Sequence, residues 1–213
     1  MDMLLFKKAY IGFELLAGLT GLIYWKKLSG SYWQYFPMYL LSIACLETLN
    51  YLIPISLRGP LAIYIIIPFE FLFMYWLFYK TLNSRPKLIW TGVLVYVFAF
   101  ILELINDAHP IGKDVFLSFS YTIGNIVLLV FILYYFYDLV NSDRILTFYR
   151  EQMFWVALGL LLFFLGTFPY FGMYNYLRNN YMALLFSYTW IVIFLDYIMY
   201  LLFAVSFIWR KTN

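Results

Sequence analysis

Carboxyl side chains occur inside the most apolar stretches of this 213-residue chain. Five of the 11 acidic residues fall inside such stretches, short of their terminal residues: Glu14, Glu47, Glu70, Glu103 and Asp196. None of the 14 Lys and Arg residues does so, apart from Lys7 and Lys8 at the edge of the first stretch. A carboxylate in hydrocarbon costs several kcal/mol, so such residues usually face a bundle interior. There they must share protons, bind a cation or form hydrogen bonds as neutral acids.

Three amide side chains accompany these acids. Asn50 follows Glu47 by three residues and Asn106 follows Glu103 by three, so each pair shares one face of a helix. Asn125 is the third amide residue, and it also lies within an apolar stretch. The candidate ligand- or ion-binding residues are therefore Glu14, Glu47, Asn50, Glu70, Glu103, Asn106, Asn125 and Asp196.

The depths of these residues can be counted from the outer helix ends at about 1.5 Å per residue. Glu103 lies about 5 Å down, Glu70 about 15 Å and Asp196 about 20 Å. This order predicts an acidic vestibule that opens to the outer face and narrows towards Asp196, with Tyr200 as a neighbouring hydroxyl. In the alternative interpretation, each acid is neutral, donates one interhelical hydrogen bond and specifies only packing.

The composition defines the elements that must position these groups. Hydrophobic residues make up 65% of the chain and charged residues 12%, with a mean hydropathy of +0.83. A soluble domain needs about twice that share of charge. The composition excludes a soluble globular enzyme, a disordered chain and a nucleic-acid binder, and it predicts an all-α integral membrane protein.

Seven apolar stretches are long enough to cross a bilayer, which takes roughly 20 residues. They predict one seven-helix transmembrane domain over residues 1–213, with spans at about 9–25, 32–55, 60–79, 88–106, 115–138, 153–177 and 182–208. These runs are continuous and lack the alternation typical of a membrane β-barrel. The segment 141–152 suits a short interfacial helix.

The basic residues predict the orientation, because cytoplasmic loops carry an excess of Lys and Arg. One face would hold nine: Lys26, Lys27, Lys80, Arg85, Lys87, Arg144, Arg150, Arg210 and Lys211. The other would hold five: Lys7, Lys8, Arg58, Lys113 and Arg178. We therefore expect the N-terminus outside and the C-terminus inside.

Short matches along the chain suggest internal repetition. Glu47-Thr-Leu-Asn50 resembles Glu103-Leu-Ile-Asn106, and Phe119-Ser-Tyr-Thr122 resembles Phe186-Ser-Tyr-Thr189. One interpretation is a leading helix followed by three helical hairpins in a parallel repeat. Chance matching in so biased a composition is the other.

No cofactor is expected from the residues present, and no metal can be assigned. A retinal protein needs a lysine in its last span, which this chain lacks, and a zinc hydrolase needs several histidines. His109 is the only histidine. Cys45 is the only cysteine, which excludes intrachain disulfides, and we expect it to be a small buried packing residue.

The leading hypothesis is a transporter or channel for a proton, a cation or a small polar solute, with the acidic cavity as its binding site. The alternative is a seven-helix sensor or accessory subunit that signals through a separate cytoplasmic partner protein. An enzyme acting on lipid is disfavoured, because no nucleophile–base constellation is visible. The expected partners are the lipid bilayer and the ligand, with no nucleic acid. The expected location is a cell membrane, specifically a bacterial inner membrane, with several crossings.

Overall fold

The computed structural model describes residues 3–82, 85–106 and 117–209, and every regular element among them is helical. The longer helices are α1 (Met3–Ile23), α3 (Tyr35–Leu52), α5 (Ile67–Thr81), α6 (Pro86–Asn106), α7 (Ser118–Val140), α8 (Gln152–Gly172) and α10 (Met182–Ile208). The shorter ones are α2 (Trp25–Leu28), η1 (Tyr32–Gln34), α4 (Ile55–Leu61), η2 (Ala62–Ile66), η3 (Asp143–Arg150) and α9 (Tyr174–Asn180). The all-α prediction is confirmed for these residues.

Within the described chain, five helices are long and apolar enough to cross a membrane. They are Gly59–Thr81, Pro86–Ile105, Ser118–Val140, Gln152–Gly172 and Met182–Ile208. The protein is a multi-pass helical membrane protein. The apolar part of α1, Ala9–Ile23, is shorter, and α3, which carries Glu47 and Asn50, is not among the five. Seven crossings therefore stay a prediction.

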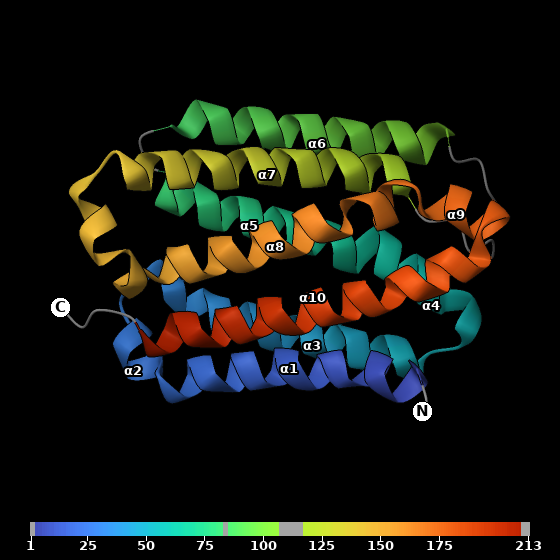
Figure 1. The fold of residues 1–213 in the computed structure, drawn as a ribbon, viewed down its shortest axis with the longest axis horizontal. Coiled ribbons are helices and arrows are strands. Elements are labelled where there is room, and N and C mark those ends of the chain that lie inside the picture. Colours follow the sequence, from blue (N-terminus) through green and yellow to red (C-terminus); the bar gives the residue numbers. More distant parts are fainter. Residues whose placement is uncertain (1–2, 83–84, 107–116, 210–213) are drawn as a thin grey trace.

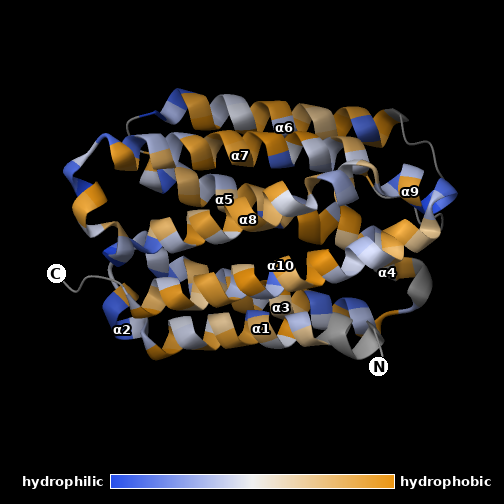
Figure 2. Cartoon of the chain, viewed as in Figure 1, coloured by the Kyte–Doolittle hydropathy of each residue, from blue (hydrophilic) through white to orange (hydrophobic). Residues whose placement is uncertain are grey.

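The outer surface of the bundle is apolar. On α6, Leu94, Phe98 and Ile105 are each more than 60% exposed, and Figure 2 shows apolar residues along the helices with hydrophilic ones gathered towards the ends. Soluble monomers rarely expose such surfaces, whereas lipid chains cover them without cost. Cys45 is also exposed, so the expectation of a buried cysteine is wrong: it lies on the outward face of α3.

The long helices lie along one common axis (Figure 1), and consecutive ones run in opposite directions. The end of α10, α2 and η3 lie at one end, whereas the start of α1, α4 and α9 lie at the other. Helix α10 packs against α8 and α1, and α7 packs against α6, α8 and α5.

Stacked aromatic rings hold α3, α5 and α10 together. The Tyr39 and Phe73 rings stack with centroids 3.9 Å apart, and Phe36 contacts Phe203 edge-on at 5.2 Å. Such pairs contribute roughly 0.5–1.5 kcal/mol each beyond their buried area. These three helices carry Glu47, Glu70 and Asp196, so the aromatic core fixes the spacing of the acids.

Two predicted spans end earlier than expected. Helix α3 stops at Leu52 because Ile53 is extended (φ −75°, ψ 160°), as the residue before a proline prefers to be. Helix α8 stops at Gly172, and the short helix α9 follows where the sixth span was expected to continue.

The segment at 141–152 contains a helix, as predicted, but of the 3-10 type and kinked at Thr147. Its Leu146 side chain is 79% exposed. The interpretations placed on His109, Lys113, Arg210 and Lys211 concern residues outside the described part of the chain.

Candidate functional site

An irregular helical turn precedes Glu70. The helix Gly59–Thr81 contains a π-helical turn at Ala62–Ile66, and Pro68 follows it. Proline has no N–H to donate, so the carbonyl four residues earlier loses its usual partner. Single π-turns within α-helices occur frequently at functional sites. Glu70 thus lies just after a helix segment whose hydrogen-bond register changes.

A cavity of about 410 Å³ lies between six of the helices. Its walls come from α1, α3, α5, α7, α8 and α10, and none of its lining residues belongs to α6. Its volume falls within the range of small-molecule sites in proteins. The aromatic residues in its lining are Tyr10, Tyr39, Tyr51, Phe71, Tyr121, Phe163, Phe164, Tyr170, Phe171, Tyr200 and Phe203.

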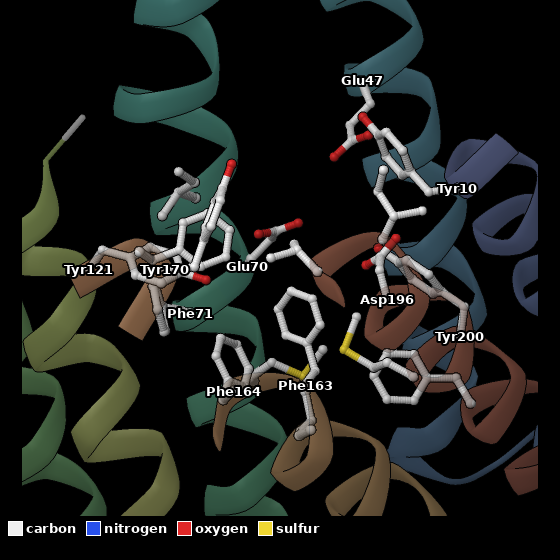
Figure 3. A pocket seen from close by; sticks show the side chains of 18 of the residues that line it. Tyr10, Glu47, Glu70, Phe71, Tyr121, Phe163, Phe164, Tyr170, Asp196 and Tyr200 are labelled. Atoms are coloured by element: carbon white, nitrogen blue, oxygen red, sulfur yellow. The ribbon is translucent and has the colours of Figure 1, made fainter. Parts of the chain in front are cut away.

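Three of the predicted acids line this cavity. Glu47 comes from α3, Glu70 from α5 and Asp196 from α10, and their carboxyl groups approach the same space (Figure 3). Tyr10 lies beside Glu47. No Lys, Arg or His is among the lining residues. The structure therefore brings together acids from three helices without a basic side chain to neutralise them.

Glu14 lies behind the wall of the cavity. Its side chain is fully buried, and Tyr200, which lines the cavity, donates a hydrogen bond from its hydroxyl to Glu14 Oε1 at 3.1 Å. Glu14 Oε2 has no hydrogen-bond partner. Tyr200, which the sequence analysis named as a hydroxyl neighbouring Asp196, reaches across to α1 in the structure.

Glu103 has a different place. Its carboxyl oxygens accept hydrogen bonds from the backbone N–H groups of Phe119 at 3.1 Å and Ser120 at 2.6 Å, in the first turn of α7. A carboxylate there satisfies N–H groups that the helix leaves unpaired and interacts favourably with the helix dipole. Glu103 therefore caps α7 and does not line the cavity. Asn106 ends α6, and its side chain lies outside the described part of the structure.

The two remaining amides, Asn50 and Asn125, do not line the cavity. Asn125 is buried between α7 and α8, where its Nδ2 donates to the carbonyl of Phe164 at 3.4 Å. Its Oδ1 has no partner, and neither has Asn50 Oδ1 on α3.

Sequence reasoning missed most of the aromatic lining. With 22 Tyr and 23 Phe in the chain, no single ring stands out, and the apolar pattern runs around every helix. Only Tyr200 carried a usable signal, one helical turn after Asp196.

The chain shows no match to protein-family models, to curated proteins or to solved structures. In the part of the chain that the structure describes, no three His, Cys, Asp or Glu side chains are grouped as metal ligands.

Proposed function

We propose that this membrane protein is a transporter or channel for a cation, a proton or a small polar solute, with the cavity as its binding site. The observation that carries the proposal is the approach of Glu47, Glu70 and Asp196 to one cavity that no basic residue lines. Unpaired carboxylates deep in a membrane are costly. A bound cation or proton offsets that cost, which gives the site its selectivity for positive charge.

The proposal includes seven crossings with the N-terminus outside and the C-terminus in the cytoplasm. Its support is the excess of basic residues at the end where Lys26, Lys80 and Arg144 lie. The opposite direction of consecutive long helices is consistent with it (Figure 1). In this orientation, Glu47 lies nearer the outer surface, and Glu70 and Asp196 lie near mid-membrane.

Single-cysteine labelling tests this topology. In a Cys45→Ala background, Asn179→Cys in α9 should react with a membrane-impermeant maleimide added to intact cells. Ser31→Cys, between α2 and η1, should react only after permeabilisation. The reverse pattern would overturn the orientation. Labelling of both positions or of neither in intact cells would contradict an odd number of crossings between residues 31 and 179.

Transport is tested with the purified full chain in liposomes. Vesicles holding a pH-sensitive dye or a radiolabelled solute should show cation- or pH-driven flux well above that of protein-free vesicles. The panel comprises protons, Na⁺, K⁺, organic ammonium ions and neutral polyols, because the carboxyl groups and tyrosines around the cavity suit each of these classes in part.

Absence of flux across the whole panel would reject transport. Ligand binding without flux would then favour the sensor function, in which the cavity receives the ligand and a separate protein carries the output.

A further inference from the structure

The cavity has two chemically different sides. Glu47 and Asp196 approach it together with Tyr10, and Glu70 points into the space between them and the opposite wall (Figure 3). The opposite wall is formed by Phe71, Tyr121 and Tyr170, with Phe163 and Phe164 beneath. A ligand that fills the cavity therefore meets carboxyl groups with one part and aromatic rings with the other.

The carboxyl side lacks internal neutralisation. Glu70 and Asp196 lie deep in the bundle, and neither carboxyl group makes a hydrogen bond with another described residue. One oxygen of Glu47 is also buried without a hydrogen-bond partner. Buried charges are normally paired. Because these carboxyl groups lack such partners, their oxygens present free hydrogen-bond acceptors to the cavity. A donor-bearing cation satisfies both their charge and their hydrogen-bonding capacity.

The aromatic side is preassembled. The Phe71 ring contacts Tyr121 edge-on at 5.4 Å and Phe164 at 5.9 Å, and Tyr121 contacts Phe171 at 4.6 Å. Aromatic faces attract cations within about 6 Å of the ring centre, and they bury apolar groups. Because these rings hold one another in place, binding orders few side chains, which lowers its entropic cost.

The size of the cavity favours a ligand larger than a bare metal ion. A cavity of about 410 Å³ far exceeds the space that one ion needs. Carboxyl groups spread along one side suit the several N–H donors of an ammonium head, while the rings opposite suit an apolar body.

We infer that the cavity binds an organic ammonium ion, with its charged head among Glu47, Glu70 and Asp196 and its apolar body against the aromatic wall. This inference rests on the proposed function, which it narrows to one class of ligand. It makes the aromatic wall a specificity element, because an inorganic cation has no apolar body to bury against the rings.

The test compares three probes on the purified full chain by isothermal titration. The 2-phenylethylammonium ion should bind at least about tenfold more tightly than neutral 2-phenylethanol, which lacks the charge, and than methylammonium, which lacks the ring. Phe163→Leu, which removes a ring from the lining and keeps an apolar side chain, should weaken 2-phenylethylammonium several-fold. The matched control is Phe98→Leu on the outward face of α6, which should leave affinity unchanged.

The other outcomes of the titration distinguish a wrong ligand class from a wrong proposed function. If 2-phenylethylammonium binds no better than 2-phenylethanol or methylammonium, or if Phe163→Leu and Phe98→Leu behave alike, the inferred ligand class is wrong. Proton or inorganic-cation flux in liposomes would then still support the proposed function. Failure of both the titration and the flux assay would overturn the two together.

Discussion

Glu70→Gln should lower cation flux through the reconstituted protein by about tenfold or more while the protein stays folded. Glutamine keeps the shape of the side chain and removes its negative charge. Glu70 points into the cavity from the middle of the helix Gly59–Thr81, where few waters screen a charge, so its attraction for a cation is strong. A tenfold change corresponds to only about 1.4 kcal/mol, which is modest for the loss of one partner in a buried charge pair.

The matched control is Glu103→Gln. It makes the same chemical change in another acid of an apolar helix, but Glu103 bonds the N–H groups at the start of α7 and does not line the cavity. Flux should therefore persist in this variant, and its thermal stability should fall slightly, because a neutral cap is weaker than a charged one. The measurements are initial flux rates in liposomes and unfolding midpoints in detergent.

Equal losses of flux in Glu70→Gln and Glu103→Gln would contradict a special role for the cavity. If Glu70→Gln retained full flux and only changed the unfolding midpoint, the acids would serve packing alone, which is the alternative interpretation of these residues.

Gly124→Ala should lower the free energy of unfolding by about 1–3 kcal/mol. A Cβ at this position of α7 would come within 2.9 Å of the Tyr96 ring and 3.1 Å of the Phe71 ring. Both rings are buried, so neither has room to move aside. The Gly124 carbonyl also accepts a 2.8 Å hydrogen bond from the Tyr75 hydroxyl, which a shift of α7 would stretch. At this chain length, the loss corresponds to an unfolding midpoint several degrees lower.

Gly12→Ala serves as the control for this prediction. Gly12 is in α1, and a Cβ built on it would have no atom within 4 Å. Alanine favours a helix over glycine by up to about 1 kcal/mol, so this variant should be as stable as the original protein or more stable. Thermal unfolding of both variants in one detergent compares them directly. A Gly124→Ala protein as stable as Gly12→Ala would show that the contact between α5, α6 and α7 is looser than the structure indicates.

The sequence by itself determined the class of protein and the stock of chemical groups. Long apolar runs can satisfy their backbone groups in a membrane only as helices or closed barrels, and continuous runs exclude barrels. The sequence also predicted the positions of the helices to within a few residues, except that α3 ends before Ile53 and α8 ends at Gly172, both earlier than expected. The scarcity of charge also made the intramembrane acids conspicuous, and three of them line the cavity.

Only the tertiary structure decided which way each helix faces. In a soluble protein, the polar stripe of a helix reveals its rotation, but these helices are apolar on every side, since one side meets lipid and the other meets the core. The sequence pattern therefore could not show that Cys45 points outward or that Tyr200 bonds Glu14. Nor could it show that Glu103 caps α7 while Glu47 lines the cavity. The aromatic wall that opposes the acids arises from packing among six helices, a property of the assembled bundle.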